Sequence, residues 1–130
     1  MSATIQATAA QLFVADISRS CGYFVERLGF SVAFTYGEPP FFAQVRRDGG
    51  IVNLRCVEAP VIDPALRRRE ELLSSDMALA SADDLRRLFA EFEAKGAIIF
   101  QPPRVEPWGA HTFIVEDPDG NLLLFAAPAD

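Results

Sequence analysis

The spacing of apolar positions changes from strand-like to helix-like within the first thirty residues. Residues 9–14 (AAQLFV) form a short apolar run with the length and composition of a β-strand. Apolar side chains then recur with the spacing of one helical face, at Ile17, Cys21, Phe24 and Leu28. This spacing predicts an amphipathic helix with Asp16 or Ser18 as its N-cap and Gly29 just beyond its last turn. Residues 30–35 (FSVAFT) predict a second strand.

The second half of the chain repeats this order. Residues 77–80 are a short apolar run, and one helical face follows at Leu85, Leu88, Phe89 and Phe92. Gly96 ends this helix, and residues 97–100 predict a strand that Pro102 and Pro103 break. Asp84 follows Asp16 by 68 residues and Gly96 follows Gly29 by 67. Near-equal offsets favour a duplicated unit over coincidence.

Each half ends in a predicted β-hairpin. Residues 41–46 and 51–57 flank the turn sequence RDGG, and residues 111–116 and 122–126 flank DPDGN. The fold class is therefore predicted as α+β, with two tandem βαβββ modules in one domain spanning residues 1–130. Module 1 covers about residues 5–57, module 2 about residues 76–127, and a linker covers 58–75. A short helix is predicted within the linker, and its mixed charges (RRREE, 67–71) indicate a solvated face.

Composition narrows the range of functions. The net charge of −6 disfavours binding to a nucleic acid backbone, which requires clustered cations. No apolar run approaches the roughly 18 residues of a membrane span. The two cysteines lack a CxxC spacing, and the N-terminal residues lack the pattern of a signal peptide, which favours free thiols and a cytoplasmic location. One histidine, His111, excludes any site that needs two or three histidines from one chain.

Several motifs resemble those of the vicinal-oxygen-chelate superfamily, which includes glyoxalase I, bleomycin resistance proteins and extradiol dioxygenases. In module 1 the resemblance lies in Asp16-Ile17, Ser20, Tyr23-Phe24 and Leu28-Gly29-Phe30. In module 2 it lies in Trp108-Gly109, Phe113, Val115 and the DPDGN turn. The resemblance covers essentially the whole chain. It implies that the two modules curl their sheets around a cleft and that the protein is a homodimer.

The resemblance also places a divalent metal in the cleft of the family's enzymes, held by residues that map onto Ala9, Met77 and Leu124, with Asn53 at a fourth position. Alanine and leucine have no donor atom, and a methionine thioether suits Cu(I) rather than Zn, Ni, Mn or Fe. A shift of one residue would bring in Asp76 for Met77. We therefore predict no metal site and no cofactor, as in the members of the family that sequester antibiotics.

Strand alternation assigns side chains to the predicted cleft. The candidate ligand-binding residues are Gln11, Phe13, Phe41, Asn53, Arg55, Met77, Leu79, Ser81, Trp108, His111 and Leu124. The opposite faces should be core at Leu12, Val14, Leu123 and Phe125, with Ala78 and Ala80 under the second helix. A cleft of this composition is mostly apolar and suits a flat or bulky organic ligand.

Some of these residues also have ordinary structural interpretations. Trp108 can fasten its loop instead of stacking on a ligand, and one of the adjacent Phe41 and Phe42 should be core. A single His111 on a strand is more often a hydrogen-bonded structural residue than a catalytic base. Arg55 is expected to pair with a glutamate on a neighbouring strand. Cys21, on the buried helical face, is expected to be an inert thiol.

Three functions are consistent with the sequence. The first is a homodimer that binds and sequesters a bulky organic molecule or antibiotic without metal. The second is a lyase, isomerase or dioxygenase with a displaced or absent metal, acting through Gln11, Arg55, His111 or Glu116. The third is a small interaction protein whose cleft is vestigial. The sequence favours the first over the second and does not separate the first from the third.

Overall fold

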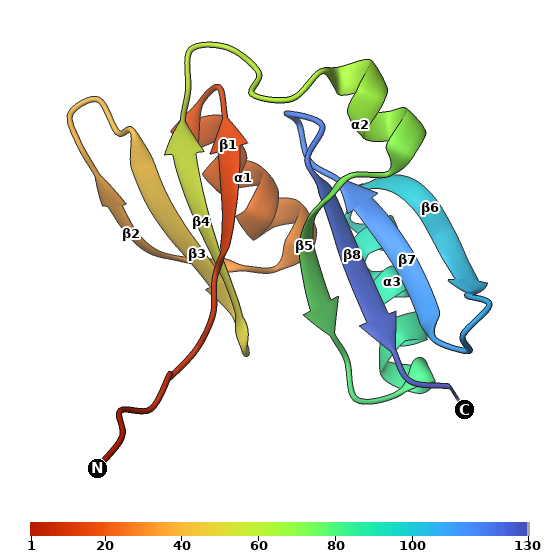
Figure 1. Ribbon diagram of the computed structural model, residues 1–130. Coiled ribbons are helices and arrows are strands. Elements are labelled where there is room, and N and C mark those ends of the chain that lie inside the picture. Colours follow the sequence, from red (N-terminus) through yellow and green to blue (C-terminus); the bar gives the residue numbers. More distant parts are fainter. Residues whose placement is uncertain (130) are drawn as a thin grey trace.

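The computed structural model describes residues 1–129 and contains two four-stranded sheets of the same topology (Figure 1). Sheet A comprises β1 (Ala10–Val14), β2 (Ser31–Tyr36), β3 (Phe42–Arg47) and β4 (Gly50–Cys56) in the order β1-β4-β3-β2, with helix α1 (Ile17–Leu28). Sheet B comprises β5 (Leu73–Ala78), β6 (Ile98–Val105), β7 (His111–Glu116) and β8 (Leu122–Ala127) in the order β5-β8-β7-β6, with helix α3 (Ala82–Ala94). In each sheet the first strand runs parallel to the last and the other pairs are antiparallel. The predicted α+β fold of two βαβββ modules is confirmed.

The ends of α1 lie where the sequence places them. The Asp16 side chain accepts a hydrogen bond from the Arg19 amide at 3.0 Å, so Asp16, and not Ser18, is the N-cap. Gly29 has the left-handed φ of 71° that ends the helix. The Arg47 guanidinium also lies close to Gly29, because its Nη1 donates a hydrogen bond to the Leu28 carbonyl. A β-carbon at position 29 would lie only 2.8 Å from this nitrogen, so the contact requires glycine.

Helix α3 begins earlier than the alignment of Asp84 with Asp16 implies. Its N-cap is Ser81, whose hydroxyl accepts from the Asp84 amide at 3.1 Å. The two N-caps are therefore 65 residues apart, not 68. The duplication is real in topology, but the helices differ in length, with 12 residues in α1 and 13 in α3.

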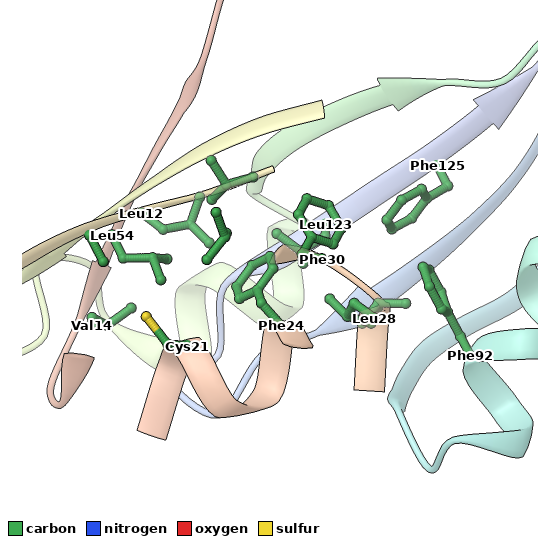
Figure 2. Packing of buried hydrophobic residues seen from close by; sticks show 14 of the residues in the cluster. Leu12, Val14, Cys21, Phe24, Leu28, Phe30, Leu54, Phe92, Leu123 and Phe125 are labelled. Carbon is green, nitrogen blue, oxygen red and sulfur yellow. The ribbon is translucent and has the colours of Figure 1, made fainter. Parts of the chain in front are cut away.

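One continuous core joins the two halves (Figure 2). Its buried side chains come from β1, β3, β4, α1, α3, β7 and β8, and include Leu12, Val14, Leu54, Phe24, Leu28, Phe92, Leu123 and Phe125. Phe113 of β7 stacks on Phe125 with ring centroids 5.0 Å apart and meets Phe92 edge-on at 6.0 Å. Because the core is shared, neither half buries its apolar residues by itself. Cys21 lies in this core, and burial raises the pKa of its thiol, as expected for an inert cysteine.

A polar junction in the DPDGN turn also connects the halves. The Asn121 side chain donates to the Phe13 carbonyl of β1 at 3.1 Å and to Asp117 at 2.9 Å. Asp119 accepts from the Ala15 amide at 2.9 Å and forms an ion pair with Arg19. Asp117 is almost fully buried, and this burial raises its carboxyl pKa to about 6 although Asn121 donates to it. The turn predicted as a local hairpin therefore fixes one half against the other.

Two strands of sheet B extend further than the sequence indicates. β5 begins at Leu73, and β6 continues through Pro102 and Pro103 to Val105. β6 is the edge strand, and its register with β7 shifts between Gln101 and Arg104. Pro102 and Pro103 lie within this shift, so their lack of N–H groups removes no hydrogen bond of the regular pairing. None of the helices within residues 1–129 has the length and apolar character needed to cross a membrane.

Candidate functional site

We call the side of sheet A that faces away from α1, and the side of sheet B that faces away from α3, the outer face of each sheet. On sheet A the inward side chains, such as Leu12 and Val45, are buried in the core. The alternate positions point outward, and their residues form an open surface that we call the platform. The platform comprises Gln11, Phe13, Phe34, Tyr36, Phe42, Gln44, Arg46, Asn53 and Arg55.

Aromatic side chains occupy one side of the platform. Phe34 and Phe42 stack with centroids 6.0 Å apart and an interplanar angle of 28°, yet Phe34 remains 46% exposed. Tyr36 continues the strip and meets Phe41 edge-on at 5.5 Å. Neither Phe41 nor Phe42 belongs to the buried core, so the expectation that one of them is core is wrong. The reason is that Phe41 precedes β3 and packs on Tyr36 at the hairpin, while Phe42 points outward.

A chain of hydrogen bonds crosses the middle of the platform. Nε of Arg46 donates to Oε1 of Gln44 at 2.7 Å, and Nε2 of Gln44 donates to Oδ1 of Asn53 at 2.9 Å. Arginine can only donate, so the oxygen of Gln44 must face it, and the orientation of both amides follows. Gln11 lies opposite Asn53 in the register of β1 with β4.

Arg55 lies at the aromatic end of the same face. It is opposite Phe13 on one side and Phe42 on the other in the strand register. Its side chain is exposed and forms no hydrogen bond or ion pair within residues 1–129. The expected glutamate partner is therefore absent from the part of the chain that the structure describes.

Helix α2 (Pro64–Glu70) packs on one end of the outer face of sheet B, beside the DPDGN turn. Arg67 is only 6% exposed and donates to Asn121 at 3.0 Å. Arg68 pairs with Glu116 of β7 and lies over the Phe100 ring, 4.9 Å from its centroid. The expectation that these arginines form a solvated face is thus wrong for Arg67, because the helix packs on the sheet instead of standing in solvent.

On β5 the predicted facing is also wrong. Met77 and Leu79 pack against the shared core, and Ala78 and Ala80 are exposed. The side chain beside Leu124 on the outer face is Asp76, its partner in the register of β5 with β8. The error follows from the misplaced start of α3. Gln11 lies five residues before the N-cap Asp16, and the residue five positions before the true N-cap Ser81 is Asp76, so these two side chains are equivalent in the two sheets.

Met77 and Leu79 instead line a cavity of about 450 Å³ between the two halves, on the helix side of the sheets. Its floor includes Phe30 and Phe125, and its rim carries the Arg47–Glu91 ion pair, in which Nη1 and Oε2 are 2.6 Å apart. This ion pair holds the pKa of Glu91 below its usual range. The cavity is separate from the platform.

The other predicted residues are spread over the molecule. Ser81 is occupied as the N-cap of α3. Leu122 and Leu124 share the outer face of sheet B, and Leu123 and Phe125 are core, as predicted. His111 begins β7 on the inward side, in phase with Phe113. Trp108 lies between β6 and β7 and is 76% exposed, so burial does not fasten it to its loop.

The donor atoms at the family's metal positions do not fit a divalent ion. Ala9 and Leu124 have no donor atom, and Met77 packs against the core. The polar side chains nearest to these positions on the outer faces are Gln11, which lies opposite Asn53, and Asp76, which lies opposite Leu124. Two neutral amides on sheet A and one carboxylate on sheet B are a weak ligand set for a divalent metal. Across residues 1–129, no three His, Cys, Asp or Glu side chains gather in a metal-binding group.

Sequence reasoning placed Gln11, Phe13, Asn53 and Arg55 on one face but missed Phe34, Gln44 and Arg46. The sequence did contain a signal for Gln44 and Arg46, because they alternate with buried residues along the same strand as Phe42 and therefore share its face. What was not visible is the register that brings Gln44 beside Asn53.

Comparison with known proteins agrees with this geometry. A family model described as the Glyoxalase/Bleomycin resistance protein/Dioxygenase superfamily matches residues 5–125. No curated protein matches the chain.

Three solved structures illustrate the likeness. A glyoxalase/bleomycin resistance protein/dioxygenase from Alicyclobacillus acidocaldarius has a TM-score of 0.76 at 16% identity, covering 96% of this chain and 92% of that one. A bleomycin-binding protein in complex with bleomycin has a TM-score of 0.74 at 23% identity, covering 95% and 98%. The bleomycin-binding protein from bleomycin-producing Streptomyces verticillus, in complex with copper(II)-bleomycin, has a TM-score of 0.71 at 20% identity, covering 99% of each chain. At these identities the likeness establishes the fold.

Proposed function

The chain belongs to the glyoxalase/bleomycin resistance protein/dioxygenase superfamily, and from that premise we propose that it binds and sequesters a bulky, flat organic molecule on the platform. The observation that carries the proposal is the exposed Phe34–Phe42 stack on a sheet whose other face is buried along β1, β3 and β4. Side chains on a rigid sheet keep their positions, and exposed aromatic surface next to fixed polar groups is typical of a ligand site. Two solved structures of similar fold hold bleomycin, which supports small-molecule binding by this architecture.

We propose further that a second copy of the chain closes the site. Ligand pockets bury most of a ligand's surface, about 70–90% for drug-sized molecules, and one open face covers only one side of a flat ligand. The end of the outer face of sheet B that carries Asp76 and Leu124 has no contact with the arginines of α2 and is the remaining sheet surface for a second wall. The homodimer and the cytoplasmic location remain predictions.

An enzymatic role through the residues named above receives less support from the geometry. Gln11 and Arg55 lie on the platform, while Glu116 lies on sheet B in an ion pair with Arg68. His111 is on the inward side of β7. These side chains do not converge on one reacting centre within a single chain.

The test is equilibrium binding by titration calorimetry with bleomycin and a panel of fused-ring aromatic compounds. We expect Phe42→Ala to weaken the binding of any ligand found by about tenfold, because an aromatic contact is worth roughly 0.5–1.5 kcal/mol beyond its buried area. Val25→Ala, an exposed apolar position on the far side of α1, is the control and should leave affinity unchanged. A ligand that binds equally well to the Phe42→Ala protein would refute the platform as the site.

A further inference from the structure

We infer that the molecule that the platform binds is a planar aromatic anion, such as a fused-ring carboxylate. This inference rests on the proposed function and adds the charge and the hydrogen-bonding character of the ligand. It departs from what the net charge of −6 indicates for the whole chain, which would favour a cationic ligand.

The chain of hydrogen bonds that crosses the platform leaves N–H donors free for a ligand. In the chain of hydrogen bonds from Arg46 through Gln44 to Asn53, both amide oxygens are already acceptors within the protein. What remains for a ligand is the Asn53 amide nitrogen, the second N–H of Gln44 and the terminal guanidinium nitrogens of Arg46. This row of N–H groups is complementary to an acceptor such as a carboxylate, and not to an ammonium group, and the Gln11 amide opposite Asn53 can donate as well as accept.

The second observation is the position of Arg55. Its exposed guanidinium has no partner within residues 1–129 and lies between Phe13 and Phe42 in the strand register. A ring stacked on the aromatic strip would place an acidic substituent near this group. Arginine binds a carboxylate with two parallel hydrogen bonds, which fixes orientation as well as charge.

The third observation is the sign of the local charge. The outward-pointing residues of the four strands of sheet A include two arginines, Arg46 and Arg55, and no aspartate or glutamate. The chain as a whole has 18 acidic and 12 basic residues, so the platform reverses the overall sign. A local potential of this kind attracts anions to the face even though the molecule is acidic.

The experiment compares three probes that share a ring system but differ in charge: 2-naphthoate, 2-naphthamide and 2-naphthylmethylammonium. Titration calorimetry at pH 7.5 would give the affinity of each for the full chain. We expect 2-naphthoate to bind at least about tenfold more tightly than the ammonium compound, with the amide between them, and its affinity to fall as salt is added.

Variants locate the effect. Arg55→Gln should weaken 2-naphthoate about tenfold and 2-naphthamide by less than about twofold, because only the anion gains from the guanidinium charge. Arg69→Gln removes the same charge from the exposed surface of α2, away from the platform, and should change neither affinity. Both positions are exposed, so both variants should unfold at the wild-type temperature, which a thermal melt would verify.

The possible failures are distinct. Equal or tighter binding of the ammonium compound, or an equal loss from Arg55→Gln and Arg69→Gln, would overturn the inference. If binding of all three probes also depended on Phe42, the proposed function would still stand. If none of the three bound at millimolar concentration, the inference would fail, and the proposed function would fail with it unless bleomycin or a panel compound bound in a Phe42-dependent way.

Discussion

The outer faces of sheet A and sheet B have the same strand order but are used in opposite ways. On sheet B, Ile114 and Leu122 point outward, yet they are 2% and 0% exposed, and α2 packs over this face through Arg67 and Arg68. On sheet A no segment of residues 1–129 covers the equivalent positions, and Phe34 and Phe42 remain accessible. A pair of duplicated modules thus differs mainly in what covers each sheet.

This difference shows where a duplicated fold can place a site. The linker helix α2 packs on sheet B, where Arg67 donates a hydrogen bond to Asn121 and Arg68 forms an ion pair with Glu116. The other module keeps an open sheet whose polar groups are fixed by one another and not by a covering helix. Stability and binding are therefore expected to be separable by mutation, in sheet B and sheet A respectively.

The largest contrast should come from two phenylalanines. Phe113→Ala in sheet B removes a fully buried ring that contacts three others, and we expect a loss of about 3–5 kcal/mol in the free energy of unfolding. Phe42→Ala on the platform should cost about 1 kcal/mol or less, while it weakens ligand binding. Urea unfolding followed by circular dichroism measures both, and similar losses would show that the platform is part of the structural core.

Two asparagines give the next contrast. Asn121→Ala removes the side-chain partner of Arg67, of the Phe13 carbonyl and of Oδ2 of Asp117, and we expect a loss of about 3 kcal/mol. Asn53→Ala removes a bond between two partly exposed amides and should cost less than about 1 kcal/mol. If both variants unfold at the same urea concentration, the polar junction contributes less than its buried hydrogen bonds indicate.

The third contrast is a dependence of stability on pH. Asp117 has a pKa of about 6 in the folded protein and a reference value of 3.8, so the folded state binds the proton more tightly. Its contribution to stability is fully present below about pH 4 and is lost as the pH rises through 6, by roughly 3 kcal/mol at most. Asp117→Asn should lack this loss between pH 4 and pH 7, whatever its absolute stability.

Asp76→Asn, an exposed carboxylate in the same sheet, is the control and should keep the wild-type pH dependence. Urea unfolding at four pH values between 4 and 7 compares the three proteins. Parallel curves for wild type and Asp117→Asn would contradict the assignment of the pKa to this residue.

The fold could be predicted from the sequence because its signals are local. The apolar face of α1, Gly29 after its last turn and the DPDGN turn each act over a few residues, and the structure places all three where the pattern indicates. The errors arose where two local signals compete. Ser81 and Asp84 can both begin a helix, and the alignment of Asp84 with Asp16 shifted β5 by three residues and reversed its faces.

The candidate site was predicted only in part because its geometry depends on pairing between strands. Alternation places Gln11, Asn53 and Arg55 on one face without any knowledge of register. The contact of Gln44 with Asn53 and the stacking of Phe34 on Phe42 depend on which residues lie opposite each other across β2, β3 and β4. The cover over sheet B depends on where a helix of the linker packs, for which its charge pattern gives no indication.

The hydroxyl of Tyr23 donates to the Glu116 carbonyl at 2.8 Å and accepts from the Ile98 amide at 2.9 Å, so a side chain of the first helix completes a strand pair in the other half. Arg27 similarly donates to the Lys95 carbonyl at the end of α3 at 2.8 Å. A protease that cut the exposed segment around residues 58–62 would therefore release two fragments that each lack hydrogen bonds that the other supplies. Such fragments should recombine on mixing, and the severed chain should behave as a complementing pair instead of two independent folding units.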